Sequence, residues 1–236
     1  MSNKRKFTMD DFEKGLVLLG LVSPSSEAEI NEIAALKDFE KEASKQRQQL
    51  HFKRVVLAAE IVSKLFNEPT FGRIKFQKLV YLCEHVAQMN LTYRYSKQAA
   101  GPFDNKFMHS IHTEFKRLKW FDVQIIKENN FSRNKYVPLD NINGYLSYYS
   151  SYFTNEDEQI QTVIDLFRTK KTDETELAAT VFACYLELSE KGELSKSSLL
   201  QLFYSWSEKK QRFTEIQIID SFNWLIKNSL IPEIAL

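Results

Sequence analysis

The sequence predicts a mainly α-helical protein that carries one small β-hairpin. Apolar residues recur three or four positions apart through most of the chain, which is the spacing of one face of an α-helix. Two β-type runs follow Trp120 and predict the hairpin. The composition is globular, with 43% hydrophobic and 27% charged residues and only 6 Gly and 5 Pro among 236 residues. A chain of this kind is able to bury a core.

Residues 27–50 predict a long amphipathic helix that follows the break at residues 23–26. Its narrow apolar stripe is surrounded by Lys, Glu and Gln and consists of Ile30, Ile33, Leu36, Phe39 and Ala43. One interpretation is a surface helix packed on its own domain. The other is a coiled-coil or partner-binding arm. The pattern leaves both open.

Two further helices follow this segment. Residues 52–66 have a wide apolar face that predicts a core helix, and the Asn-Glu-Pro run at 67–69 ends it. Residues 73–89 predict the central helix. Its inward face is expected to carry Ile74, Leu79, Tyr81, Leu82 and Val86, and its other face the basic residues Arg73, Lys75 and Lys78.

A polar insert separates the central helix from the next one. Tyr93, Arg94 and Tyr95 predict a short strand, and Gly101 and Pro102 predict a turn. Asp104 or Asn105 is expected to cap a helix that runs to about Lys119, with Phe107, Ile111, Phe115 and Leu118 facing inward.

The predicted strands at 121–126 and 134–139 are joined by a turn at 127–130. Helix, insert, helix and hairpin follow one another in the order of a winged helix. The predicted fold is therefore a helical domain with a winged-helix-like core and a small β-hairpin.

The remainder of the chain predicts helices at 144–153, 155–167, 175–189, 194–206 and 213–228. We divide the chain into an N-terminal segment with the amphipathic arm (1–50), a winged-helix-like core (51–153) and a C-terminal helical subdomain (154–236). The charged run at 170–173 is the candidate linker.

Little in the sequence points to catalysis. His109 and His112 lie three apart on a predicted helix, but their spacing matches no strong zinc signature. The sequence also lacks a nucleophile elbow and a glycine-rich phosphate loop. The paired carboxylates at 10–11 and 156–158 are typical of helix N-termini. We therefore predict a protein that is not an enzyme and has no catalytic residue, metal or cofactor.

The cysteines and the hydropathy indicate a location. Cys83 and Cys184 lie within apolar helical patterns and are expected to be buried thiols in a reducing compartment. No apolar stretch is long enough to span a bilayer. The apolar run at 16–22 follows acidic residues and lacks a cleavage site, which argues against a signal peptide. We expect a cytoplasmic protein with no membrane partner.

The formal net charge is only +1, so nucleic-acid binding would depend on a local patch. In a winged helix the helix before the hairpin is the recognition candidate and the hairpin reaches the phosphate backbone. The alternative is a solvated face, and the same ambiguity holds for Lys209, Lys210 and Arg212. The basic residues of the central helix, the recognition candidate and the hairpin are Arg73, Lys75, Lys78, Lys106, Lys116, Arg117, Lys119, Arg133 and Lys135.

Two sequence motifs carry a family resemblance. The run IKFQKLVYLCEH, followed at a distance by AAGPFDN, resembles the Panacea or SocA-like antitoxin domain. The chain from about residue 52 to its end resembles more closely a helical module at the C-terminal end of some bacterial type I restriction specificity subunits. The matching residues are Lys75, Gln77, Lys78, Leu79, Tyr81, Gly101, Pro102, Asp104 and Asn105. Neither family brings a catalytic residue.

The resemblance implies a non-catalytic, protein-binding accessory or antitoxin-type component of a bacterial defence system, either restriction–modification or toxin–antitoxin. Its partner would be a toxin or a defence subunit, and the arm at 27–50 offers a surface for homo-oligomers. The alternative is a winged-helix regulator or restriction-subunit module that contacts duplex DNA. The predicted contact residues are Arg73, Lys75, Lys78, Tyr93, Arg94, Tyr95, Gly101, Pro102, Asp104, Asn105, Lys116, Arg117, Lys119, Arg133 and Lys135.

Overall fold

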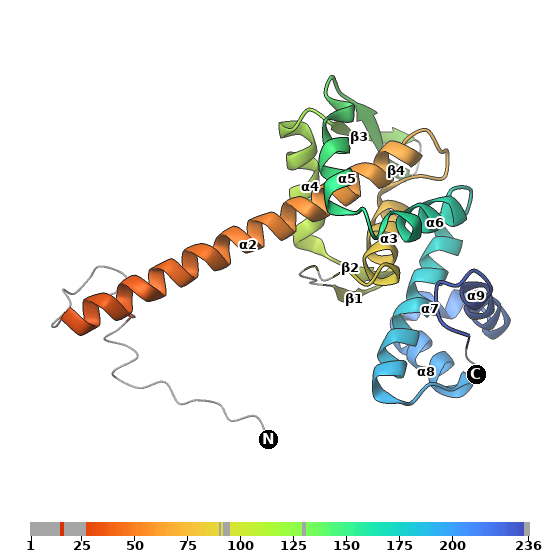
Figure 1. Cartoon of the computed structure of the whole chain (residues 1–236). Helices are drawn as coiled ribbons and strands as arrows, with labels where there is room; N and C mark the ends of the chain where they lie inside the picture. Colours follow the sequence, from red (N-terminus) through yellow and green to blue (C-terminus); the bar gives the residue numbers. More distant parts are fainter. Residues whose placement is uncertain (1–14, 17–26, 90, 92–94, 129–130, 234–236) are drawn as a thin grey trace. The chain divides into compact units, whose positions relative to one another are not determined.

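A computed structural model describes residues 15–16, 27–89, 91, 95–128 and 131–233 (Figure 1). Most of the described chain is helical, and the strands found in it form two small two-stranded sheets. The protein is therefore mainly α, as predicted. The chain separates into two compact units, Met1–Leu50 and His51–Leu236. The three-part division made from the sequence stays a prediction.

Helix α2 (Glu27–Leu65) is one continuous helix of 39 residues. The prediction of two helices that meet near residue 51 is therefore wrong. The residues at the expected junction are Gln, Leu, His, Phe and Lys, none of which breaks a helix. The helix ends shortly before Pro69, where the prediction placed its end.

Helix α3 (Arg73–Val86) lies inside the His51–Leu236 unit and packs against α6 (Asp157–Phe167) and α7 (Thr172–Lys191). Ten successive residues, from Lys75 to Glu84, are buried. The expected solvent face with Lys75 and Lys78 is therefore wrong, and Ile74, expected to face inward, is 40% exposed. The reason is that later helices, distant in sequence, cover the side of α3 that the local pattern leaves to water.

The insert before α4 forms a small ribbon of β1 (Ser96–Gln98) and β2 (Gly101–Phe103). The predicted turn at Gly101 and Pro102 is wrong, because both residues belong to β2 and the turn lies at residues 99–100. Of the predicted strand at 93–95 only Tyr95 is described, and it precedes β1 without belonging to a strand. Tyr93 and Arg94 lie outside the described residues.

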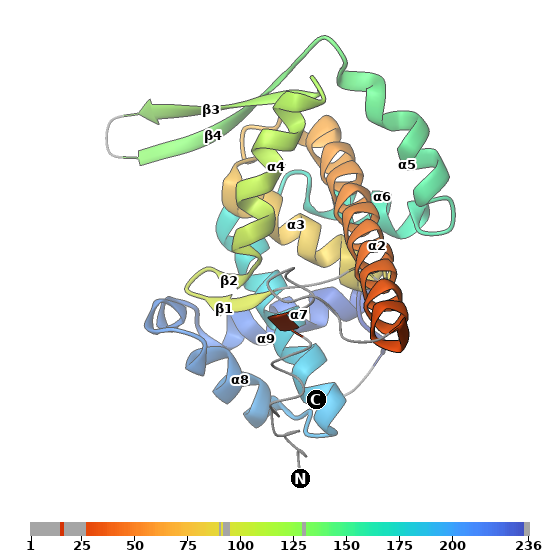
Figure 2. The ribbon, with the colours of Figure 1, turned by 90° about the vertical axis from the view of Figure 1, so that its left-hand side faces the viewer.

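Helix α4 (Asn105–Arg117) begins as predicted, because the Asp104 side chain accepts the Phe107 backbone N–H at 3.0 Å. Phe107, Ile111 and Phe115 are buried, which confirms the predicted inward face. The helix packs against the hairpin that follows it (Figure 2).

The predicted hairpin is confirmed as the antiparallel pair β3 (Phe121–Glu128) and β4 (Phe131–Pro138). Its strands are longer than expected, so Lys127 and Glu128 lie in β3 and not in the turn. The pairing begins with Phe121 opposite Pro138 and ends with Glu128 opposite Phe131. Helix, helix and hairpin follow one another in the predicted order, and the winged-helix comparison stays an interpretation of that order.

After the hairpin the chain is helical again. The predicted helices are confirmed with ends shifted by a few residues as the segment of η1 (Ile142–Tyr145) and α5 (Leu146–Tyr152), α6, α7, α8 (Lys196–Ser205) and α9 (Glu215–Lys227). The short 3-10 helix η2 (Glu208–Arg212) between α8 and α9 was not predicted. Helix α7 is buried along most of its length, and α8 and α9 pack on it (Figure 1). Thr172, in the predicted linker, already belongs to α7. Within the part of the chain that is described, no helix has both the length and the apolarity to cross a membrane.

Candidate functional site

The motif residues of the sequence meet in the interior of the His51–Leu236 unit. Arg54 of α2 donates from Nε to Glu84 Oε1 of α3 at 2.5 Å and from Nη1 to Asp104 Oδ2 at 2.7 Å. Tyr95 donates its hydroxyl to Glu84 Oε2 at 2.5 Å. Arg54, Glu84 and Asp104 are buried. This network therefore joins α2, α3, the segment before β1 and the start of α4.

Gly101 and Pro102 face a second interior cluster. Lys78 of α3 donates from Nζ to the Pro102 carbonyl at 2.6 Å. A Cβ on Gly101 would lie 2.7 Å from Thr180 Oγ1 of α7, and the φ of this residue is +98°. Both the close approach and the backbone conformation require glycine here. The Gly-Pro motif thus allows β2 to pack against α3 and α7.

A second buried ammonium group lies close to Lys78. Lys210 of η2 donates from Nζ to Glu176 Oε1 at 2.8 Å and to Thr180 Oγ1 at 2.9 Å. Burial lowers the pKa of Lys78 to about 7, and the charge of Lys210 acts in the same direction. The expectation that Lys210 belongs to an exposed basic cluster is wrong, although Lys209 and Arg212 are exposed.

Lys75 has a structural role at the end of α6. Its Nζ donates to the carbonyls of Arg168 at 2.8 Å and Lys170 at 2.7 Å, and to Thr70 Oγ1 at 2.8 Å. Carbonyls at a helix C-terminus lack intrahelical partners, so a buried cation stabilises them. Burial lowers the pKa of Lys75 to about 8. Lys75 and Lys78 are thus parts of the core and not surface contacts.

The remaining predicted contact residues divide by exposure. Tyr95, Gly101, Pro102 and Asp104 belong to the interior arrangements described above. Arg133 lies in β4 opposite Ile126. Lys116 contacts Asp122 at 3.4 Å, and Arg117 contacts Glu114 at 2.6 Å. The exposed members of the predicted set are Arg73, Asn105, Lys116, Arg117, Lys119 and Lys135.

In the described part of the chain, the histidines and cysteines are not grouped into a metal site. His109 is exposed and His112 is half-buried. Among the described residues, no group of three or more His, Cys, Asp or Glu side chains is placed to hold a metal. Cys83 and Cys184 are free and buried, as predicted, and burial raises the pKa of the Cys184 thiol to about 12. A thiol held protonated in this way is a weak nucleophile.

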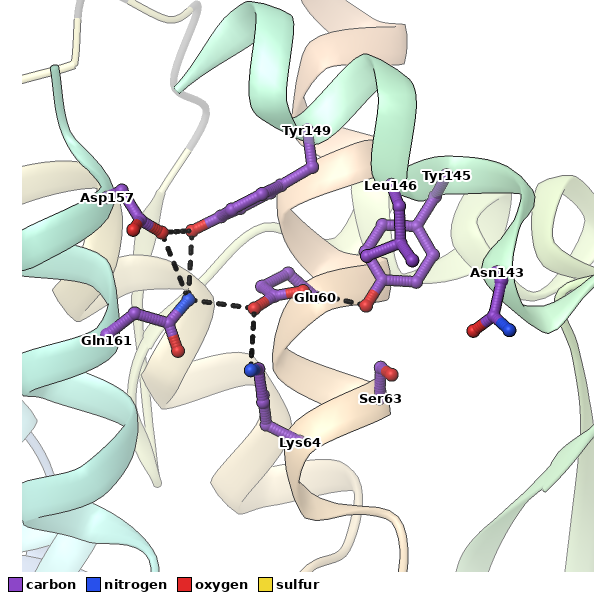
Figure 3. Close-up of a pocket in the computed structure, with 9 residues that line it drawn as sticks. All are labelled: Glu60, Ser63, Lys64, Asn143, Tyr145, Leu146, Tyr149, Asp157 and Gln161. Atoms are coloured by element: carbon purple, nitrogen blue, oxygen red, sulfur yellow. Dashed lines mark hydrogen bonds and ion pairs between the residues drawn. The ribbon is translucent and has the colours of Figure 1, made fainter. Parts of the chain in front are cut away.

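An open cavity of about 540 Å³ lies between α2, the η1–α5 segment and α6 (Figure 3). Its lining comes from three segments that are far apart in the sequence. The residues that line it are Glu60, Ser63, Lys64, Asn143, Tyr145, Leu146, Tyr149, Asp157 and Gln161.

Two carboxylates organise this cavity. The buried Glu60 accepts from the Tyr145 hydroxyl at 2.7 Å and from Gln161 Nε2 at 2.8 Å. Asp157 Oδ1 accepts from the Tyr149 hydroxyl at 2.7 Å and from Gln161 Nε2 at 3.2 Å. Figure 3 shows Gln161 between the two acids. Burial raises the pKa of both tyrosines, so their hydroxyls remain donors.

Sequence reasoning missed this cavity. Glu60 is a charged residue within an otherwise apolar helical face, which was an available signal of a buried, paired carboxylate. Asp157 was interpreted only as a helix N-terminal charge. The aromatic segment at 144–153 was noted, but the sequence does not show that its Tyr145 and Tyr149 meet these two acids.

The Met1–Leu50 unit contributes a different feature. In the part of α2 that belongs to it, Leu36 is 39% exposed and Phe39 is 73% exposed. The flanking residues Lys37, Asp38 and Glu40 are exposed as well. This segment therefore presents large apolar side chains to water between charged ones.

Comparison with models of known protein families finds no match for this chain, and comparison with curated proteins finds none either. The resemblance to the antitoxin domain and to the restriction-associated module therefore stays a prediction.

Replacing Arg54 by Met should strongly destabilise the protein. Glu84 and Asp104 would remain buried without their cation, and breaking such a pair costs about 3–5 kcal/mol of unfolding free energy. Urea denaturation followed by circular dichroism measures the loss. The control is Arg117→Met, because the Arg117 side chain is 62% exposed in its pair with Glu114, and the expected loss is below about 1 kcal/mol. Equal losses of unfolding free energy in the two variants would contradict the role of Arg54 as the buried cation of Glu84 and Asp104.

Lys78 should make the stability depend on pH. In the unfolded chain its pKa is near 10.5, whereas in the folded protein it is about 7. Between about pH 7 and 8.5 the unfolded state therefore binds more protons, and the unfolding free energy rises with pH by about 1.5 kcal/mol from this group. Urea titrations at the two pH values test this. Lys78→Met should remove the part of the rise that comes from Lys78, while Lys75, whose pKa is about 8, keeps its own smaller contribution. Exposed Lys116→Met should keep the full rise, and an unchanged rise in Lys78→Met would refute the expectation.

Proposed function

We propose that this protein is a non-catalytic, protein-binding accessory or antitoxin-type component of a bacterial restriction–modification or toxin–antitoxin system, acting in the cytoplasm. The observation that carries the proposal is the apolar stripe of α2 in the Met1–Leu50 unit, in which Leu36 and Phe39 are exposed although Ile33 is buried.

The spacing of this stripe suits a helical partner. Leu36, Phe39 and Ala43 are separated by three and four residues, so they lie on one side of the helix. Burying apolar surface against a partner is favourable by about 25 cal/mol per Å². An amphipathic helix recognised through anchors at such spacing is a recurring mode of protein binding. The exposed charges beside the stripe, such as Lys37 and Glu40, would select the partner.

The interior position of the motif residues supports the same function. Lys78 joins α3 to the Pro102 carbonyl of β2, and Asp104 joins the start of α4 to Arg54 of α2. A motif of this kind maintains a shape, and a protein that acts by contact requires a defined shape. The partner would then be a toxin or a subunit of the defence complex, and a second copy of this chain is the competing occupant of the stripe.

Phe39→Glu should abolish partner binding without unfolding the protein, because Phe39 is mostly exposed. The measurement is co-purification from the native host with identification of the partner by mass spectrometry, together with light scattering of the isolated chain. The control is Lys41→Glu, on the opposite side of α2. A partner retained equally by Phe39→Glu and wild type would refute the role of the stripe. Loss of a homodimer alone would identify a second copy as the occupant.

One observation favours the alternative, a DNA-binding winged helix. Exposed Lys116, Arg117 and Lys119 lie at the end of α4 that precedes β3, and α4 packs on that strand. Phosphate contacts of this kind make affinity fall steeply with salt.

Arg117→Ala and Lys119→Ala should weaken binding to a mixed-sequence duplex, measured by fluorescence anisotropy at several salt concentrations. Each lost phosphate contact should lower the slope of log affinity against log salt by about 1. Lys196→Ala on α8 is the exposed control. If wild type shows no salt-dependent binding, the DNA alternative is wrong.

A further inference from the structure

We propose that the cavity between α2, α5 and α6 binds a guanidinium group, supplied by an arginine side chain of the protein partner. The choice of an arginine on a protein rests on the proposed function. The chemistry of the guanidinium site rests only on the lining of the cavity.

The donors nearest to Glu60 and Asp157 are already used, although Ser63, Lys64 and Asn143 in the same lining carry donors as well. The hydroxyls of Tyr145 and Tyr149 already donate to Glu60 and Asp157, and Gln161 Nε2 donates to both acids. Asp157 Oδ2 and Gln161 Oε1 receive no hydrogen bond from any described residue. An acidic oxygen and an amide oxygen therefore remain for a ligand that brings N–H groups.

The charge of the lining selects a cation. Glu60 and Asp157 supply two carboxylates, whereas Lys64 supplies one ammonium group, 3.6 Å from Glu60 Oε1. Lys64 is partly exposed and leaves Asp157 without a cation among the described residues. Glu60 is nearly inaccessible to water, so its charge is weakly screened on the cavity side.

A guanidinium fits these groups better than an ammonium. Its N–H donors lie in one plane as a rigid fork, which offers two parallel donors to a pair of oxygens. Here the two oxygens that remain open, Asp157 Oδ2 and Gln161 Oε1, belong to residues one turn apart on α6 (Figure 3). An ammonium is a strongly hydrated point charge without that fork.

The size and the surroundings of the cavity favour an arginine that belongs to a polypeptide. A volume of about 540 Å³ exceeds that of a single side chain and leaves room for its neighbours. Leu146, 45% exposed, lines the cavity and offers an apolar contact. A partner segment with an apolar residue beside its arginine would use this contact.

The test is titration of the full chain with three probes by calorimetry. These are acetyl-Leu-Arg-Leu-amide, the same peptide with neutral citrulline in place of arginine, and agmatine. The arginine peptide should bind saturably and the citrulline peptide roughly tenfold more weakly or worse, because the citrulline side chain carries no charge. Equal binding of arginine and citrulline peptides, or no saturable binding of the arginine peptide, would overturn the proposal. If agmatine binds as tightly as the arginine peptide, the inference that the guanidinium belongs to a protein is wrong.

Substitutions in the cavity lining test whether the arginine peptide binds there. Asp157→Asn should weaken the arginine peptide roughly tenfold, while Asp165→Asn, on the same helix but outside the cavity, should leave its affinity unchanged. Glu60→Gln is the second variant, with its fold checked by circular dichroism because Glu60 is buried. Unchanged affinity in Asp157→Asn would overturn the site. If the arginine peptide does not bind but Phe39→Glu still loses the partner, the cavity proposal is wrong and the protein-binding function stands. If the peptide binds but Phe39→Glu keeps the partner, the cavity proposal stands and the role of the stripe is wrong.

Discussion

The interaction on which the core arrangement depends is the set of three charge-assisted hydrogen bonds that Arg54 makes to Glu84 and Asp104 inside the protein. The guanidinium reaches Glu84 in the middle of the fold and Asp104 at the start of α4. It also lies 4.1 Å from the centre of the Phe107 ring. A planar, permanently charged group with several donors is suited to joining two buried carboxylates in this way. Because Asp104 also caps α4, the same contact sets where that helix begins.

Removing water from three charges is expensive, and the geometry of the network offsets that cost only while all three groups are present. The orientation of α2, α3 and α4 toward one another is therefore tied to one side chain.

The two buried lysines show a related use of charge. Lys75 donates to three oxygens at the end of α6, whereas Lys78 makes one hydrogen bond, to Pro102, near the charge of Lys210. Both lysines were interpreted as surface residues from their place beside the apolar stripe of α3. In the structure they connect α3 to the helices that cover it. The basic surface that remains lies on α4 and the hairpin, with Arg73 on α3, and is smaller than the sequence suggested.

Helix α2 serves two purposes along its length. Its last turns carry Arg54 and Glu60, which organise the interior network and the polar cavity. Its earlier part, in the Met1–Leu50 unit, keeps Leu36 and Phe39 at the surface. One uninterrupted helix therefore includes both the residues that maintain the fold and those proposed to meet a partner. The cavity at Glu60 belongs to the His51–Leu236 unit and differs in chemistry from the apolar residues Leu36 and Phe39.

The sequence by itself determined the elements whose signals are local. The period of apolar residues predicted the helices, the Asp104 cap marked the start of α4, and the β-type runs after Trp120 predicted the hairpin. What only the tertiary structure decided is which polar side chains are buried and with whom. Lys75, Lys78, Glu60 and Asp157 look alike in a helical pattern, since a charged residue beside an apolar stripe is normally solvated. Their surroundings come from α6, α7 and the η1–α5 segment, tens of residues away in the chain. Long-range packing, and not local spacing, places a partner next to each of them.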